Sequence, residues 1–192
     1  MNKYDVIIIG AGPSGIFCAY ELMRQKPDMK VLMIEKGRSI EKRQCPKRTT
    51  KVCVGCKPCS ITTGFAGAGA FSDGKLSLSP DVGGTLPEIL GYEKAEELIK
   101  EADNIYLKFG ADEKVYGIDD YEAIERIRAK AIRANLKLIE CPIRHLGTEE
   151  GYKIYTRLQE HLLASGVEIK FMTMVQDIII EDGVAKGVVT DK

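Results

Sequence analysis

The sequence predicts an α/β protein of the Rossmann-like type, built from a parallel sheet, helices and a β-meander, with an inserted helical segment of a second domain. Two short apolar runs, residues 5–9 and 31–34, are typical of buried parallel strands. Between them, residues 13–25 have the apolar spacing of a helix, and a glycine-rich turn at 10–15 joins the first strand to it. The order strand, turn, helix, strand is that of a dinucleotide-binding βαβ unit.

After this unit comes a long segment, residues 36–84, with little periodicity, and such long loops are usually functional. Helices are predicted over 94–109 and 119–135, and the second of them is expected to turn Ile127 and Ile132 inward. The remaining patterns predict a strand at 136–141, a helix at 148–165, and strands at 167–171, 175–180 and 184–190. The pair Asp182-Gly183 predicts a hairpin turn between the last two strands.

The chain of 192 residues is long enough for one good core or two small ones. Residues 1–80 and 145–192 are expected to build the Rossmann-like domain. Residues 81–144 are expected to form a mainly helical insertion that begins a second domain.

Charge and hydropathy exclude several classes of partner. Lys plus Arg and Asp plus Glu both number 28, and the net charge of zero argues against nucleic acid. No apolar run reaches the length of about 18 residues that indicates a membrane span. The uncharged stretch 6–20 is interrupted by glycines and a proline, which a nucleotide turn explains better than a signal peptide does. We expect a cytoplasmic protein whose partner is a small-molecule substrate or an electron carrier.

The turn after the first strand has the sequence Gly10-Ala11-Gly12-Pro13-Ser14-Gly15, a G-x-G-x-x-G fingerprint. Gly10 permits the tight turn, Gly12 lets the backbone approach a pyrophosphate, and Gly15 lets the helix pack close to the strand. The N-terminus of the helix offers N–H groups and a positive dipole end to phosphates. Glu35, 20 residues after Gly15, is placed to accept hydrogen bonds from a ribose, and its charge disfavours NADP there. We expect Lys36 to contact the adenosine end; the alternative is a glycine-rich turn that binds nothing.

Several segments resemble a known family. Residues 4–15 are similar to the opening of FAD-binding oxidoreductases, in which Pro13 is common. Residues 64–76, with the cysteine-rich segment before them, resemble the uncharacterised FAD-dependent dehydrogenases, or NAD(P)/FAD-dependent oxidoreductases, as do residues 144–148 and the final meander. The resemblance implies FAD as cofactor, its pyrophosphate on the turn at 10–15, dehydrogenase activity on an unidentified substrate, and NAD(P) as a co-substrate.

The resemblance also concerns length. Proteins of that family are normally much longer and carry a later Gly-Asp segment for the ribityl end of FAD, so this chain resembles their N-terminal portion. A C-terminal part or a partner chain would then complete the enzyme. The alternative function is a nucleotide-binding or electron-transfer module, stabilised by zinc or an iron–sulfur cluster and active only with that partner.

The glycine-rich loop is a second candidate surface for the cofactor. Gly67, Gly69 and Gly74 suggest a backbone that passes close to a ligand or adopts positive φ, and successive N–H groups in such loops can bind anions. By the resemblance, this loop faces the FAD pyrophosphate or the flavin ring and presents Ser72 and Asp73. The alternative is a tight structural turn. No acid, base or hydride path is assigned among these residues.

Four cysteines have the spacing of metal ligands: Cys45, Cys53, Cys56 and Cys59. Four thiolates suit either a [4Fe–4S] cluster or a structural zinc ion. A cluster beside a flavin would form an electron-transfer pair, whereas zinc would stabilise the long loop. The same spacing is compatible with a redox-active dithiol and with free surface thiols. The remaining cysteines, Cys18 and Cys141, are expected to be buried as small apolar side chains.

A run of seven basic residues and one acidic residue extends from Lys36 to Lys51. It is interpreted as a solvated surface, as a counter-charge to thiolates and phosphates, or as a docking surface for an acidic electron carrier. Of the two histidines, His145 follows a predicted strand and is placed to reach a site, whereas His161 lies within a predicted helix.

Overall fold

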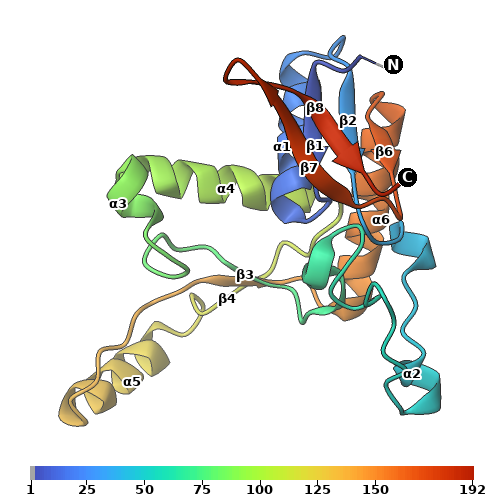
Figure 1. The fold of residues 1–192 in the computed structure, drawn as a ribbon. Coiled ribbons are helices and arrows are strands. Elements are labelled where there is room, and N and C mark those ends of the chain that lie inside the picture. The colour runs from blue at the N-terminus through green and yellow to red at the C-terminus, as the bar shows by residue number, and fades with distance from the viewer. Residues whose placement is uncertain (1–2) are drawn as a thin grey trace. The chain divides into compact units, whose positions relative to one another are not determined.

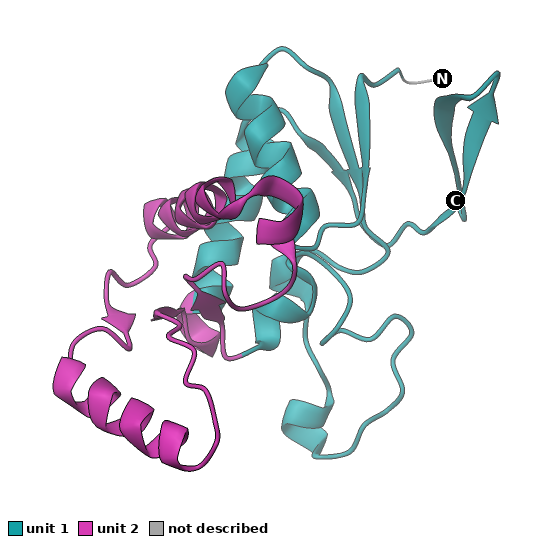
Figure 2. Cartoon of the chain, turned by 90° about the vertical axis from the view of Figure 1, so that its left-hand side faces the viewer, with its two compact units in different colours: residues 1–72, 151–192 teal, residues 73–150 magenta. Residues whose placement is uncertain are grey.

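The computed structural model of the protein describes residues 3–192. The chain forms two compact units, residues 1–72 with 151–192 and residues 73–150 (Figure 2). These units divide the chain at 72/73 and 150/151, whereas the sequence predicted divisions at 80/81 and 144/145. No helix within the described residues combines the length and the apolar character that a membrane crossing requires.

The first unit contains the predicted βαβ motif, which consists of β1 (Val6–Ile9), α1 (Pro13–Gln25) and β2 (Val31–Ile34) (Figure 1). A third strand, β6 (Glu168–Lys170), pairs with β2, so that the sheet has the order β1-β2-β6 and is parallel throughout. Val6 is paired with Val31, and Leu32 with Glu168. The predicted Rossmann-like α/β fold is thereby confirmed in this unit.

The core of the first unit lies between β2, α1 and the part of α6 (Thr148–Ala164) that follows residue 150. All four residues of β2 are buried, as expected for a central parallel strand. The helices contribute the buried apolar side chains Ile16, Ala19, Tyr20, Met23, Ile154, Leu158 and Leu162. Full burial of one large aliphatic side chain stabilises a fold by about 1.5–3 kcal/mol. On the edge of this core, the ring of His161 lies 5.4 Å from the ring of Tyr20.

The last two strands, β7 (Val175–Glu181) and β8 (Val184–Thr190), form an antiparallel hairpin in the first unit. Asp182 and Gly183 have φ angles of 50° and 75°, the left-handed values that a two-residue type I′ turn requires. The predicted hairpin turn is confirmed. Of the three strands predicted after α6, β6 joins the parallel sheet, and β7 and β8 form the hairpin.

Between β2 and the second unit, the long segment forms three short helices: η1 (Ile40–Lys42), α2 (Lys47–Thr50) and η2 (Gly67–Phe71). An isolated parallel bridge pairs Arg38 with Gly64. The bridge brings residues 38 and 64 together, so the cysteine-rich residues between them form one long loop.

The second unit combines helices with a small antiparallel sheet. Its helices are α3 (Leu86–Leu90), α4 (Tyr92–Lys108) and α5 (Tyr121–Arg133), and its strands are β3 (Lys75–Ser77), β4 (Val115–Tyr116) and β5 (Ile143–His145). The sheet has the order β3-β5-β4. The strand predicted at 136–141 is wrong, because the register with β3 starts only at Ile143, which pairs with Ser77. The apolar run before it remains largely exposed, with Leu136 at 66% and Ile139 at 50%.

Helix α5 forms where the sequence predicted a helix, but its surroundings differ from the prediction. The carboxylate of Asp120 caps it by accepting a hydrogen bond of 2.8 Å from the Ala123 amide. Ile127 and Ile132, expected to point inward, are 53% and 66% exposed. Amphipathic spacing predicts a helix from local sequence, but it does not supply the surface against which the apolar face packs.

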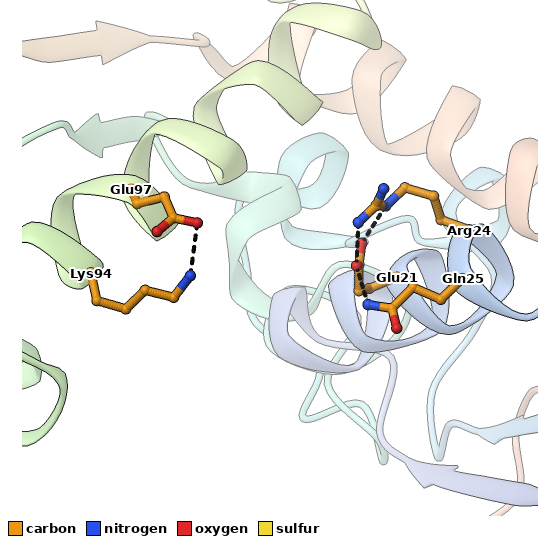
Figure 3. A network of polar contacts seen from close by, with 5 residues as sticks. All are labelled: Glu21, Arg24, Gln25, Lys94 and Glu97. Carbon is orange, nitrogen blue, oxygen red and sulfur yellow. Dashed lines mark hydrogen bonds and ion pairs between the residues drawn. The ribbon is translucent and has the colours of Figure 1, made fainter.

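Surface helices carry local ion pairs of the kind that contribute little stability. On α1, Glu21 accepts hydrogen bonds from Arg24 and Gln25, and on α4 Lys94 pairs with Glu97 at 2.7 Å (Figure 3). The hydrogen bond from Arg24, followed by that from Gln25, lowers the pKa of Glu21 to about 2. Because all of these side chains are well exposed, we expect each pair to contribute at most about 0.5 kcal/mol.

A buried ion pair holds the second unit together. The guanidinium of Arg144 on β5 is 4% exposed and binds both carboxylate oxygens of Asp103 on α4, at 2.5 and 2.8 Å. It also donates to the carbonyl of Asp112 at 2.5 Å. The hydrogen bonds to Asp103 raise the pKa of Arg144 above its usual value. This one side chain therefore fastens the sheet of the unit to its longest helix.

Replacement of Arg144 by methionine is expected to lower the free energy of unfolding by about 3 kcal/mol, because it leaves the partly buried Asp103 carboxylate without this partner. Urea denaturation followed by circular dichroism measures the loss. The exposed pair supplies the control: Lys94→Met should change the same quantity by less than about 0.5 kcal/mol. Equal effects of the two substitutions would contradict the role given to Arg144.

Candidate functional site

The turn after β1 is shaped by two glycines with opposite surroundings. A Cβ atom built at Gly15 would lie 2.1 Å from the carbonyl oxygen of Gly10, so any side chain there would displace the turn. A Cβ built at Gly12 meets no atom of the described residues within 4 Å. The turn is itself anchored by the Gly10 amide, which donates to the Ile34 carbonyl of β2 at 2.8 Å. Gly15 is thus required by the fold, whereas Gly12 borders open space.

Helix α1 begins at this open space with its amides uncapped. Gly12 is the N-cap residue and Pro13 follows it, and neither a side-chain cap nor an acidic residue in the first turn serves the helix. Ser14 is exposed in the first turn. A helix start of this kind presents N–H donors and the positive end of the helix dipole to an anion.

The carboxylate of Glu35 lies at the end of β2 and is 6% exposed. One oxygen accepts a hydrogen bond of 2.9 Å from the Ala11 amide, and the other accepts one of 2.7 Å from the Gly37 amide. A carboxylate offers about four acceptor positions, so two remain for hydroxyl groups of a ligand. Glu35 therefore has a structural role, and its predicted ribose-binding role stays a prediction.

The glycine-rich loop lies beside the same turn. The Ala66 amide donates to the carbonyl of Ala11 at 2.7 Å, and a Cβ built on Gly67 would lie 3.7 Å from the Cα of Gly12. A Cβ on Gly69 would lie 3.2 Å from the hydroxyl of Tyr155 on α6. The structure thus brings Gly67 and Gly69 to the predicted site, and Tyr155 is a neighbour that no local signal in the sequence indicates.

The interpretation of the basic run as a solvated surface is wrong for one residue, Arg43, which is buried. Six of the run's seven cations are exposed, but Arg43 is 3% exposed and donates to carbonyl oxygens of the loop that follows the cysteines. Its acceptors are the carbonyl groups of Ser60, Ile61, Phe65 and Gly67, at 2.5–3.1 Å. Burial lowers the pKa of Arg43, while the charges of Glu35 and Cys59 act in the opposite direction.

Of the other predicted cofactor residues, Ser72, Asp73 and Gly74 have local partners. The Ser72 hydroxyl donates to the Gly69 carbonyl at 3.1 Å, and Lys36 is exposed. Asp73 belongs to the second unit, where its carboxylate meets Lys75 at 2.7 Å and His145 at 2.9 Å. The hydrogen bond from Lys75, followed by that with His145, lowers the pKa of Asp73. Within the second unit, Gly74 accepts a hydrogen bond from the Leu146 amide through its carbonyl.

The cysteines are not gathered into a metal site. All six are free thiols, and no group of three or more His, Cys, Asp or Glu side chains in the described part of the chain is arranged to hold a metal ion. Cys45 and Cys56 are partly exposed, and Cys53 and Cys59 are exposed. The expectation that Cys18 is buried is wrong, because it lies on the outer side of α1.

Comparison with known proteins identifies similar chains. Residues 1–41 match the Thi4 family. Thiamine thiazole synthase from Coprinopsis cinerea is 52% identical over 33 residues, which are 17% of this chain and 10% of that protein. The structure of glycine oxidase from Bacillus cereus is 19% identical and superposes with a TM-score of 0.54 over 99% of this chain and 53% of that one. A 3-ketosteroid-delta4-(5alpha)-dehydrogenase from Rhodococcus jostii RHA1 is 18% identical, with a TM-score of 0.57 over 98% and 42%.

The two solved structures confirm the Rossmann-like fold. The family match covers the βαβ unit, which contains the turn and Glu35. The chain spans 10% of the curated relative and 53% and 42% of the two solved structures.

Cys59 is expected to react faster with iodoacetamide at neutral pH than Cys53, although both thiols are exposed. Hydrogen bonds with the Thr62 amide, the Ile61 amide and the Thr62 side chain lower the pKa of Cys59, and Arg43 adds to the effect. A lowered pKa increases the thiolate fraction at pH 7, and the thiolate is the nucleophile. The advantage should shrink as the pH rises above about 8.5, where an ordinary thiol also ionises.

Peptide mass spectrometry of samples alkylated between pH 6 and pH 9 measures both rates in one protein. Thr62→Val removes one of the hydrogen bonds and should slow the reaction of Cys59 alone. Equal rates at neutral pH would show that the environment of Cys59 does not activate its thiol.

Proposed function

We propose that this chain forms the FAD-binding part of an FAD-dependent oxidoreductase of the dehydrogenase type. The observation that carries the proposal is the open position at Gly12, in front of the uncapped start of α1 and near a buried carboxylate. Phosphate binding requires N–H donors with space before them, and ribose binding requires acceptors for two hydroxyl groups. The turn and Glu35 supply both within one βαβ unit.

The residues fit a dinucleotide with a free ribose 2′-hydroxyl better than one carrying a 2′-phosphate. The negative charge of Glu35 opposes a phosphate on the ribose, so NADP is disfavoured at this site. Gly67 lies next to Gly12, so the loop provides a second wall beside the space in which a pyrophosphate would lie. The similarity of residues 1–41 to the Thi4 family supports the same assignment.

Bound FAD would supply the electron-transfer chemistry, and the residues of this chain bind and orient it. We further propose a small-molecule substrate or an electron carrier as the reaction partner, and NAD(P) as a co-substrate bound elsewhere. A C-terminal part or a partner chain would complete the enzyme. Reduction of the bound flavin by NADH or NADPH, followed at its visible absorption bands, tests the co-substrate.

The metal site at Cys45, Cys53, Cys56 and Cys59 stays a prediction from spacing. The thiols are apart in this structure, but metal binding can itself fold a loop and bring its ligands together. Elemental analysis of protein purified without oxygen, together with an assay for acid-labile sulfide, decides between zinc, an iron–sulfur cluster and free thiols.

Gly12→Ala is expected to weaken FAD binding about 10–100-fold without loss of stability, because the new methyl group enters space that only a ligand would fill. Fluorescence titration of FAD into the purified chain measures the affinity, and thermal unfolding followed by circular dichroism measures the stability. Gly15→Ala is the matched variant: its methyl group meets the Gly10 carbonyl, so it should lower the melting temperature as well.

A wild-type chain that fails to bind FAD would refute the proposal for this chain. Wild-type affinity in Gly12→Ala would show that FAD, where it binds, does not use this turn.

A further inference from the structure

We infer that Arg43 is a positioning residue of the dinucleotide site: it fixes the orientation of the peptide groups at Phe65 and Gly67 so that their carbonyl oxygens face away from the Ala11–Gly12 turn. The inference rests on the proposed function, because it concerns the wall of the site beside that turn. Nothing in the spacing of the sequence distinguishes Arg43 from its basic neighbours.

The guanidinium of Arg43 donates hydrogen bonds to carbonyl groups in two parts of the loop, residues 60–61 and residues 65–67. Its Nη1 donates to Phe65 at 2.5 Å and to Gly67 at 2.7 Å, while Nη2 donates to Ile61 and Nε to Ser60. The centre of the guanidinium also lies 4.7 Å from the ring centroid of Phe71. A planar group with five donors suits this task, and a lysine ammonium does not reproduce it.

The planarity of the peptide bond converts these contacts into orientation. In a trans peptide the C=O and N–H groups point in opposite directions. The peptide between Phe65 and Ala66 shows this arrangement directly: its carbonyl accepts from Arg43, and its amide donates to Ala11 at 2.7 Å. By the same geometry, the contact of Arg43 with the Gly67 carbonyl turns the Ala68 amide away from Arg43.

Besides Arg43, the first turn of the short 3-10 helix η2, which begins at Gly67, holds the peptide after Gly67. Because a 3-10 turn has poor hydrogen-bond geometry and glycine adopts most backbone conformations at low cost, this one turn alone resists rotation of the peptide group only weakly. A rotated peptide would bring the negative end of a carbonyl dipole toward Gly12, which the Gly67 backbone already adjoins. Since a pyrophosphate carries negative charge, such a carbonyl would repel it. Arg43 disfavours the rotated peptide because its Nη1 holds the Gly67 carbonyl oxygen by a hydrogen bond.

The packing around Arg43 shows that the loop is built to receive it. A Cβ atom at Gly64 would lie 2.6 Å from the Arg38 carbonyl oxygen, 2.8 Å from the Cδ of Arg43 and 2.9 Å from its Nε, so the absence of a side chain at 64 allows both Arg38 and Arg43 to approach. Among the described residues, the hydrogen-bond acceptors of the guanidinium are all carbonyl oxygens and none is a carboxylate. The buried cation therefore acts on the backbone of the loop.

Arg43→Met, Arg43→Lys and Arg48→Met test the inference in the purified full chain. Arg48 is the matched control, because it is exposed and lies 4.9 Å from the same Phe71 ring. Calorimetric titration measures the affinity for ADP, and NMR titration measures that for adenosine, which has no phosphates. Amide hydrogen exchange of Ala66 reports the orientation of the loop independently of any ligand.

We expect Arg43→Met to weaken ADP binding about 10–100-fold, to leave adenosine binding within about twofold, and to accelerate exchange at Ala66. Arg43→Lys should be intermediate, and Arg48→Met should match the wild type in all three measurements. If Arg43→Met does not fold, Arg43→Lys carries the test, with weaker ADP binding and faster Ala66 exchange than the wild type.

A folded Arg43 variant that binds ADP like the wild type, or weakens ADP and adenosine equally, overturns the inference. Unchanged exchange at Ala66 overturns it as well, whatever the ligand data show. A wild-type chain that binds neither ADP nor FAD refutes the proposed function instead, and the exchange measurement then decides the loop-orienting role of Arg43 by itself.

Discussion

The carboxylate of Glu35 is the contact on which the geometry of the candidate site depends. Its two oxygens hold the amides of Ala11 and Gly37, which lie in separate connections of the first unit. Each connection then contacts the glycine-rich loop: Ala11 through its carbonyl, and Gly37 through a close approach in which an added Cβ would lie 2.4 Å from the Gly64 amide nitrogen. One buried anion thus sets the distance between the nucleotide turn, the end of β2 and the loop.

The electrostatic arrangement of the unit follows from the same contact. A buried carboxylate is costly unless hydrogen bonds satisfy it, and here the backbone supplies two. The buried Arg43 carries the opposite charge, and it too is satisfied by backbone groups. The two charges interact at a distance without forming an ion pair. Each therefore orders a stretch of main chain, and neither neutralises the other directly.

The βαβ unit could be predicted closely because its signals are local. Apolar runs, a fingerprint of glycines and a single acidic residue at the end of β2 lie within 35 residues, and α1 has the bounds that its spacing predicted. Arg43 could not be predicted in this way. Its burial depends on carbonyl groups 17–24 residues further along the chain, and no property of the side chain distinguishes it from six exposed neighbours.

In the second unit, sequence patterns predicted the longer helices but not their packing. The apolar spacing of α5 is correct for a helix, yet Ile127 and Ile132 remain exposed, because periodicity does not identify a packing partner. The strand before helix α6 lies later in the chain than the apolar run at 136–141 predicts, since Ile143–His145 pair with β3 and the more apolar run does not. The cysteine spacing likewise indicates ligands without determining whether the backbone brings them together.

The distribution of the histidines gives the protein two natural spectroscopic probes. The sequence contains only two, and the division of the chain places His161 in the first unit and His145 in the second. Their surroundings differ: one ring lies against Tyr20, the other against the carboxylate of Asp73. Imidazole proton resonances should therefore report on each unit separately, without isotopic labelling or an introduced reporter group. During denaturation, coincident loss of the two native signals would indicate one cooperative fold, and separate loss would indicate two.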